Sequence, residues 1–254
     1  MPHVLTTTHD RILRIEIDRP ERKNAITADM YQAMADALRA AESDPQVRVV
    51  LIHGKPDCFT AGNDLKDFLE RPPSGDNSPV FQFLQAISAA TKPLVAAVGG
   101  PAVGIGTTML LHCDFIYASS NARFQMPFVS LGLVPEAASS LLLPMLAGYQ
   151  RAAELLLLGK PFTAEKALAA GIVTEIVPEG DLLDYAVEVA EAIAALPPSS
   201  VRMTKALMKS RHAAAVKEAM GAEGEMFRAQ LGSPEAKEAM QAFFEKRKPD
   251  FSRF

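Results

Sequence analysis

The chain has 254 residues, of which 48% are apolar, so it can bury the core of one large domain or of two smaller ones. A formal net charge of −4 gives no electrostatic reason to expect a nucleic acid or an anionic membrane surface as partner. The two cysteines, Cys58 and Cys113, lie far apart and neither has a CxxC spacing, which argues against a disulfide framework and is typical of a reducing compartment. The N-terminus resembles neither an export nor a transit signal, so we expect a cytoplasmic protein.

The first predicted elements are two strands and a cationic loop. Polar and apolar residues alternate over 11–18, which predicts a half-exposed strand, antiparallel to residues 3–9, with Leu13, Ile15 and Ile17 on its buried face. The next segment, 19–24, holds three cations. It is interpreted in two ways, as a solvated turn or as a site for a phosphate-bearing ligand.

A helix, a strand and a first glycine turn follow. Apolar residues recur at spacings of three and four between residues 27 and 41, which predicts a helix capped by Thr27. The run 47–52 predicts a buried strand. Residues 59–65 then lead through Gly62 into a helix that starts near residue 64 or 65. We therefore expect free backbone amides at this turn.

The middle of the chain is a glycine-rich apolar run. Before it, the Pro- and Gly-dense segment 72–79 predicts a mobile loop that serves as an entry lid, and 80–90 predicts a helix. The uncharged run 93–111 is nearly long enough to cross a bilayer. Glycine and proline residues interrupt it where a spanning helix needs continuous backbone bonding, so we expect no membrane partner. Instead, 93–98 predicts a buried strand.

The second glycine turn, 103–106, ends this strand and starts a new helix near Ile105. The first amides of that helix have no intrahelical acceptor and lie at the positive end of its dipole. Such a terminus is suited to bind an anion. Further strands are predicted over 113–118, 121–125 and 171–177, with helices elsewhere from residue 137 onward.

Glu136 follows a proline inside an apolar stretch and is the candidate acid or base. By position alone, Pro-Glu is an ordinary helix start in which the carboxylate complements the helix dipole. Apolar neighbours favour a functional carboxylate over a solvated one; they are Leu131, Leu133, Val134 and 141–143.

Three other chemistries are not supported. His112, Cys113 and Asp114 would point to opposite faces of a strand, so we expect no metal site. Gly104 and Gly106 lack the third glycine of a dinucleotide-binding fingerprint. No serine lies in a G-x-S-x-G nucleophile turn.

The chain is expected to end in a helical region after residue 196. Three helices are predicted, over 198–211, 213–229 and 234–246. So small a helical group cannot bury all of its apolar surface alone. We therefore expect residues 1–196 to form a core and 197–254 to form an oligomerisation region that packs on another subunit.

Three segments, in this order, resemble the enoyl-CoA hydratase/isomerase (crotonase) family: 59–65 (Phe-Thr-Ala-Gly-Asn-Asp-Leu), 92–106 with its Gly-Gly-Pro-Ala-Val-Gly-Ile-Gly turn, and Cys113-Asp114. The resemblance covers essentially the whole chain. It implies an α/β fold, a right-handed spiral of ββα turns with a C-terminal helical trimerisation region. It also implies a homotrimer, or a hexamer made of two trimers.

The resemblance implies an acyl-CoA thioester as substrate, with no separate cofactor because coenzyme A is part of that substrate. In the family two backbone N–H groups hold the thioester oxygen, and by position they are those of Asn63 and Ile105. Residues implied to bind coenzyme A or the rest of the substrate are Lys23, Ala25, Ala61, Gly62, Asp64, Leu65, Gly104 and Phe128.

Within the family the chain is most similar to Δ3,Δ2-enoyl-CoA isomerases of the peroxisomal type. The two glutamates of the hydratases fall at Thr108 and Phe128, so the acid and base for adding water are missing. Glu136 resembles the single glutamate base of the isomerases. The resemblance implies that Glu136 removes a proton from C2 and returns it at C4 while the two amides stabilise the dienolate. Phe128 is expected to exclude water and to raise the pKa of Glu136.

Two alternatives stay open. One is that the chain catalyses hydration or another family reaction on a coenzyme A thioester, such as a ring-type isomerisation. The other is that it is a non-catalytic acyl-CoA-binding protein that keeps the fold.

Overall fold

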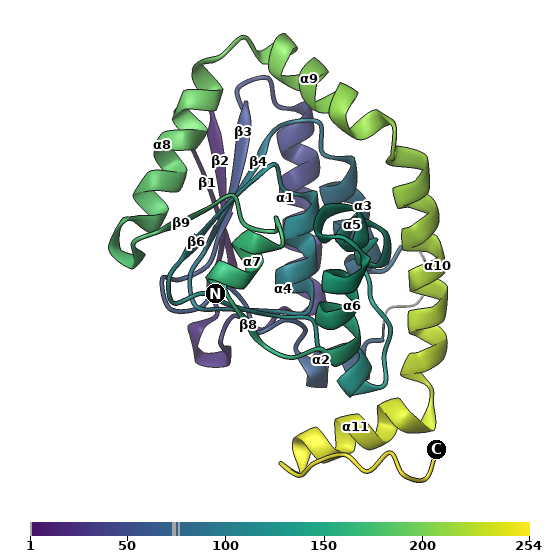
Figure 1. The fold of residues 1–254 in the computed structure, drawn as a ribbon. Coiled ribbons are helices and arrows are strands. Elements are labelled where there is room, and N and C mark those ends of the chain that lie inside the picture. Colours follow the sequence, from purple (N-terminus) through teal and green to yellow (C-terminus); the bar gives the residue numbers. More distant parts are fainter. Residues whose placement is uncertain (1, 73–74, 76) are drawn as a thin grey trace.

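The computed structural model describes residues 2–72, 75 and 77–254, and within them a six-stranded sheet forms the centre of the molecule (Figure 1). Its strands, in spatial order, are β1 (Val4–His9), β2 (Ile12–Ile17), β3 (Val49–His53), β4 (Leu94–Val98), β6 (Phe115–Ser119) and β9 (Glu175–Val177). The predicted β1–β2 pair is antiparallel, and every other neighbouring pair is parallel. Parallel neighbours require crossovers, which here are supplied by the helices.

A smaller sheet of three strands stands at the end of the first one. It consists of β5 (Pro101–Val103), β7 (Arg123–Gln125) and β8 (Phe162–Thr163). The chain bends from β4 into β5 at Gly100, whose φ is +61° and where a Cβ would lie 1.9 Å from the Asp57 carbonyl oxygen. Only glycine permits this bend. Two turns of the spiral thus contribute a strand to the large sheet and then a short strand to the small one, as β4–β5 and β6–β7.

The helices of the main body cover both faces of the large sheet (Figure 1). α8 packs on one face, over a cluster that includes Ile12, Leu51 and Val95. The other face carries α1 and α3 and the larger core cluster. The expectation of a half-exposed β2 was therefore only partly right, because α8 covers the end that includes Ile12. The helices of this body are α1 (Ala28–Ser43), α2 (Leu65–Glu70), α3 (Pro79–Ala89), α4 (Ile105–Thr108), α5 (Ser139–Ala147), α6 (Tyr149–Leu158), α7 (Ala164–Ala169) and α8 (Leu182–Ala195).

Several predicted elements are shorter than expected. The helix expected from Ile105 is only the four residues of α4, Ile-Gly-Thr-Thr, none of which is a strong helix former, and a 3₁₀ turn, η2 (Met109–His112), follows. The strand expected over 171–177 shrinks to β9, because Gly171 adopts a φ of +77° in the preceding turn. None of the helices in the described part of the chain combines the length and apolar character that a bilayer crossing requires.

The segment expected to form an entry lid over 72–79 includes Pro73, Ser74 and Asp76, which lie outside the described residues. Its last residues belong to the next helix. Ser78 caps α3, and its side chain accepts a hydrogen bond from Phe81 N.

The three predicted C-terminal helices are confirmed as α9 (Pro198–Ser210), α10 (Ala213–Leu231) and α11 (Pro234–Phe244). In Figure 1, α9 runs across the top of the body, α10 runs down one side and α11 lies below. A buried ion pair holds α9 there, because Lys205 Nζ lies 2.6 Å from Asp114 Oδ2 and also donates to the Lys92 carbonyl oxygen. α11 touches the 3₁₀ turn η3 (Val129–Leu131).

Lys205→Met should lower the free energy of unfolding by about 3 kcal/mol, because it leaves the Asp114 carboxylate without its cation in a mostly buried setting. Urea denaturation measures the change. The matched control is Lys217→Met, which removes an exposed cation on α10 and should shift stability by less than about 0.5 kcal/mol. Equal midpoints for both variants would contradict this role for Lys205.

Candidate active site

The two glycine turns that the sequence singles out lie against each other. Thr60 N donates to the Pro101 carbonyl oxygen at 2.9 Å, and Val103 N donates back to the Thr60 carbonyl oxygen at 3.0 Å. Gly62 has a φ of +87°, and a Cβ there would lie 2.7 Å from the Val103 carbonyl oxygen. The close approach of the two turns therefore depends on glycine at this position.

The N–H groups of Asn63 and Ile105 have no protein acceptor among the described residues. A parallel bridge between Ile26 and Asn63 uses Gly62 O and Asp64 N, so the N–H of Asn63 points to the other side of its segment. Ile105 is the first residue of α4, where a helix leaves its N–H groups without intrahelical partners. Both donors are thus available to a ligand.

Glu136 is buried and hydrogen-bonded. The residue is 8% exposed, and Thr108 Oγ1 donates to Glu136 Oε1 at 2.6 Å. The pKa of Glu136 is raised to about 7, mainly by burial. The hydrogen bond from Thr108 lowers this pKa, and the charge of Glu223 raises it further. Both protonation states of Glu136 are therefore populated near neutral pH. A group that takes up a proton and then returns it needs both states.

The backbone after Glu136 is unusual, because Ala137 and Ala138 have φ values of +60° and +56°. Left-handed backbone costs a non-glycine residue roughly 1–2 kcal/mol. His112 Nε2 donates to the Ala137 carbonyl oxygen at 2.8 Å, and burial lowers the pKa of His112 to about 4, so its ring is neutral. α5 begins only at Ser139, which rules out the alternative that Glu136 simply occupies the first turn of a helix.

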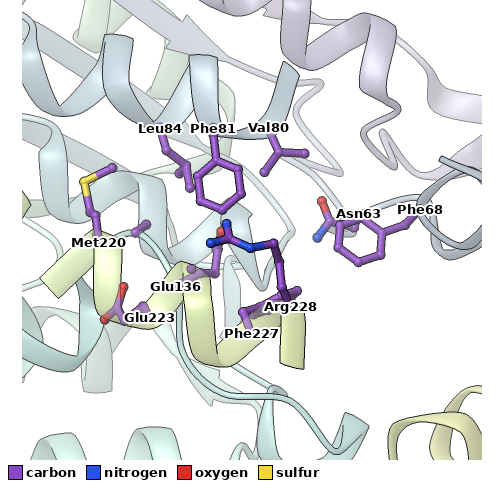
Figure 2. A pocket seen from close by; sticks show the side chains of 12 residues that line it. Asn63, Phe68, Val80, Phe81, Leu84, Glu136, Met220, Glu223, Phe227 and Arg228 are labelled. Atoms are coloured by element: carbon purple, nitrogen blue, oxygen red, sulfur yellow. The ribbon is translucent and has the colours of Figure 1, made fainter. Parts of the chain in front are cut away.

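Glu136 faces a largely apolar pocket (Figure 2). Its lining residues are Asn63, Phe68, Val80, Phe81, Leu84, Glu136, Ala137, Met220, Glu223, Gly224, Phe227 and Arg228. Gly224 lets α10 approach α3, because a Cβ there would lie 2.7 Å from the Phe81 ring. An acyl chain is the kind of ligand that such a wall suits.

Phe128 does not line this pocket, contrary to the prediction that it shields Glu136. It is buried in the core just before η3. The aromatic wall comes instead from Phe68, Phe81 and Phe227. The helix α10 had been expected to face another subunit, and the structure shows that one side of it closes the pocket.

The side chain of Asn63 is held by α1. The Tyr31 hydroxyl, which is fully buried, donates to Asn63 Oδ1. Burial raises the pKa of Tyr31 well above its ordinary value, and the charge of Glu136 raises it further, so the hydroxyl stays protonated. Tyr31 thereby fixes the segment whose N–H is a candidate oxyanion donor.

The cationic loop is joined to the first glycine turn. Arg19 Nη1 donates to Asp64 Oδ2 at 2.7 Å and to the Ala25 carbonyl oxygen at 2.9 Å. Ala61 N donates to the Lys23 carbonyl oxygen, so the predicted coenzyme A residues of both loops are neighbours. Arg19 is therefore committed to holding the loops together. The Lys23 side chain lines a second pocket beside this junction.

Of the remaining predicted site residues, Leu65 opens α2, with Asp64 capping it, and Gly104 precedes α4 with a φ of +57°. Neither Leu65 nor Gly104 lines the pocket of Glu136. The residues 112–114 precede β6 and are not in a strand, so the reason given against a metal site was wrong. Across the described residues, no three His, Cys, Asp or Glu side chains are grouped as metal ligands.

Sequence reasoning missed the role of Thr108. The resemblance places Thr108 at the position of a hydratase glutamate and gives it no function of its own. The structure makes its hydroxyl the hydrogen-bond partner of Glu136. The signal was present, because a residue at a catalytic position of the family is expected to point into the site.

Known proteins similar to this chain share one family description. The chain matches the family model described as enoyl-CoA hydratase/isomerase over residues 7–253. It is 38% identical over 215 residues to human enoyl-CoA delta isomerase 2, covering 82% of this chain and 54% of that protein. It is 30% identical to the 2,3-dehydroadipyl-CoA hydratase of Escherichia coli K12, over 99% of both chains. The chain spans about half the length of the human isomerase.

Solved structures confirm the predicted fold class. An enoyl-CoA hydratase/isomerase from Pseudoalteromonas atlantica T6c is 46% identical, with a TM-score of 0.95 over 99% of this chain and 100% of that one. OdaA from Pseudomonas aeruginosa is also 46% identical, with a TM-score of 0.93 over 96% of this chain and 99% of that one. The α/β spiral with its C-terminal helical region is shared with these proteins.

Proposed function

Because the chain belongs to the enoyl-CoA hydratase/isomerase family, we propose that this enzyme is an acyl-CoA double-bond isomerase that converts 3-enoyl-CoA into the conjugated 2-enoyl-CoA. The observation that carries the proposal is the buried Glu136 beside Thr108 in an apolar pocket. Glu223, which also lines the pocket, has both carboxylate oxygens engaged by backbone N–H groups. One available carboxylate suits a proton shift, whereas hydration needs both an acid and a base.

In the proposed reaction the thioester oxygen accepts hydrogen bonds from the N–H groups of Asn63 and Ile105. Glu136 takes a proton from C2, the electron pair of that C–H bond spreads into a dienolate, and the negative charge gathers on the thioester oxygen. Glu136 then delivers the proton to C4, which leaves the double bond between C2 and C3 and restores the carboxylate. The two amides contribute through stabilisation of the dienolate charge.

We place the coenzyme A part of the substrate along the joined loops of Lys23, Ala25, Ala61, Asp64 and Leu65. Support comes from the backbone bond between Ala61 and Lys23, which sets these residues beside the turn that carries the Asn63 donor. The acyl chain then runs from that turn toward Phe81 and Phe227.

We also propose a homotrimer, or a pair of trimers, that assembles through the helical region. Support comes from large apolar side chains that α9 and α11 leave exposed, among them Leu207 at 75% and Phe243 at 58%. Exposed apolar groups of this size are typical of surfaces that another chain covers.

Hydration is the second candidate, because the relative named as a hydratase aligns with 99% of this chain. The deciding experiment offers purified enzyme 3-enoyl-CoA and 2-enoyl-CoA separately in D₂O. An isomerase converts the first to the conjugated thioester, with deuterium at C4 wherever the proton held by Glu136 has exchanged with solvent. A hydratase forms 3-hydroxyacyl-CoA from the second, and a non-catalytic binder converts neither thioester. Failure to convert 3-enoyl-CoA would refute the proposal.

The rate of isomerisation should rise with pH through an apparent pKa near 7. Only the deprotonated Glu136 takes the C2 proton, and burial raises the pKa of this group to about 7. Thr108→Val removes a hydrogen bond that lowers this pKa, so its profile should move to higher pH. The measurement is kcat/KM against pH.

Thr107→Val is the matched control for Thr108→Val, because the Thr107 hydroxyl donates to the Ala102 carbonyl oxygen and not to Glu136. Its pH profile should coincide with that of the wild type. A wild-type profile that rises near 4.5, the ordinary pKa of glutamate, would contradict a buried Glu136 as base.

A further inference from the structure

Glu223, on α10, caps a helix that is distant in the sequence. Its Oε2 accepts a hydrogen bond from Ala138 N at 2.6 Å, and its Oε1 accepts one from Ser140 N at 2.8 Å. These N–H groups lie at the start of α5, where a helix has no acceptors of its own. Glu223 is 6% exposed, so its carboxylate is a buried acceptor, bound to the buried N–H of Ala138 and the part-buried N–H of Ser140.

The N–H groups that Glu223 binds belong to the strained turn directly after Glu136. Ala137 and Ala138 are both left-handed, a conformation that alanine rarely adopts unless its surroundings enforce it. The His112 ring holds the Ala137 carbonyl from one side, and Glu223 holds Ala138 N from the other. This turn sets the direction in which the Glu136 side chain leaves the backbone.

We propose that Glu223 is a positioning residue of the isomerisation: it holds the left-handed turn of Ala137 and Ala138 and thereby aims the Glu136 carboxylate at the reacting carbons. The inference rests on the proposed function of Glu136 as base. Figure 2 shows Glu136 and Glu223 near each other among the side chains that line the pocket, and Glu223 comes from α10.

The site requires a carboxylate at position 223. Both oxygens of Glu223 accept from N–H donors, so a glutamine satisfies only one of them and sets its own NH₂ group against the other. An aspartate lacks one methylene and ends short of Ala138 and Ser140. Only glutamate supplies two acceptors at this reach.

Glu223 also acts on the charge of Glu136. Among the described residues, Tyr31 on α1 interacts with the charge of Glu136, His112 on η2 bonds the adjacent Ala137, and Glu223 and Arg228 on α10 line the same pocket. Tyr31 and His112 are neutral, and the nearby negative charge of Glu223 disfavours ionisation of Glu136. Removing that charge should therefore lower the pKa of Glu136.

The test compares Glu223→Gln with wild type and with Glu225→Gln, an exposed glutamate on the same helix. We expect Glu223→Gln to lower kcat for 3-enoyl-CoA by about 10- to 100-fold, with KM within about twofold, because the turn is displaced while the pocket and the amide donors remain. The pH profile of kcat/KM should move to lower pH. Glu225→Gln should match the wild type in all three quantities.

A second measurement does not depend on turnover. Infrared titration of the Glu136 carboxylate, taken as the difference from Glu136→Gln, should give a lower pKa in Glu223→Gln than in the wild type. If the wild type fails to isomerise 3-enoyl-CoA while this shift appears, the proposed function fails and the link between the two carboxylates stands. Unchanged titration and unchanged kcat overturn the inference.

A rescue variant separates positioning from general loss of folding. Glycine adopts the left-handed conformation without strain, so Ala138→Gly added to Glu223→Gln should recover part of the lost kcat and keep a folded enzyme. A loss of kcat that follows only the thermal midpoint, with the pH profile unmoved, would show a merely structural Glu223 and overturn the proposal.

Discussion

Glu136→Gln should lower kcat for the isomerisation of 3-enoyl-CoA by at least about 1000-fold, because a general acid–base group contributes roughly 10²–10⁴ and this one serves both proton transfers. Glutamine keeps the size of the side chain and can still accept the Thr108 hydrogen bond. Binding of a saturated acyl-CoA, measured by calorimetry, should stay within about twofold. Retained isomerase activity in this variant would refute the mechanism.

The same substitution should stabilise the protein at high pH. The folded state raises the pKa of Glu136 from 4.5 to about 7, so it binds this proton more tightly than the unfolded chain does. Stability therefore falls as pH rises between these values, by roughly 3 kcal/mol in full. Urea denaturation at pH 8 should show Glu136→Gln to be the more stable protein, and the gap should close below pH 4.5.

Ile105→Pro should lower kcat/KM by roughly 10²–10³, the usual cost of removing one oxyanion donor. Proline is favoured at the first position of a helix, which Ile105 occupies, so α4 can still form while its free N–H is lost. The buried Ile105 side chain is also lost, and that contribution must be measured separately.

Ile105→Ala supplies the control, since it truncates the side chain and keeps the N–H group. We expect it to lower the thermal midpoint at least as much as Ile105→Pro while retaining activity within about tenfold of the wild type. If the alanine and proline variants are equally impaired, the backbone donor of Ile105 has no catalytic role.

The sequence was most informative where a pattern is local. Helical spacing located α1 and the three C-terminal helices to within a few residues, and alternation located β2. Glycine turns located the neighbourhood of the Asn63 and Ile105 amides. The free N–H of Ile105 follows from helix geometry, whereas that of Asn63 depends on the bridge to Ile26. β5 and β8 escaped prediction since three and two residues carry no periodicity.

The parts that could not be predicted depend on contacts between distant segments. Glu223 lies 85 residues from Ala138, and nothing in its surroundings distinguishes it from an ordinary helix glutamate. The left-handed turn could not be predicted either, because alanine stands at 137 and 138, where glycine or asparagine usually marks such a turn. Phe128 was assigned to the pocket from its family position, whereas Phe81 and Phe227 fill that role from other helices.

Because α10 closes the pocket, the activity of a chimaera made from two related enzymes depends on where the two sequences are joined. A crossover between two relatives at residue 196 or 197 would pair the Glu136 loop of one parent with Met220, Glu223 and Phe227 positions from the other. Chimaeras of this kind should remain active only when the parent that supplies α10 carries glutamate at 223, because the N–H groups of 138 and 140 require that carboxylate. Laboratory evolution confined to either segment would therefore explore a narrower range of acyl chains than evolution that mutates the two together.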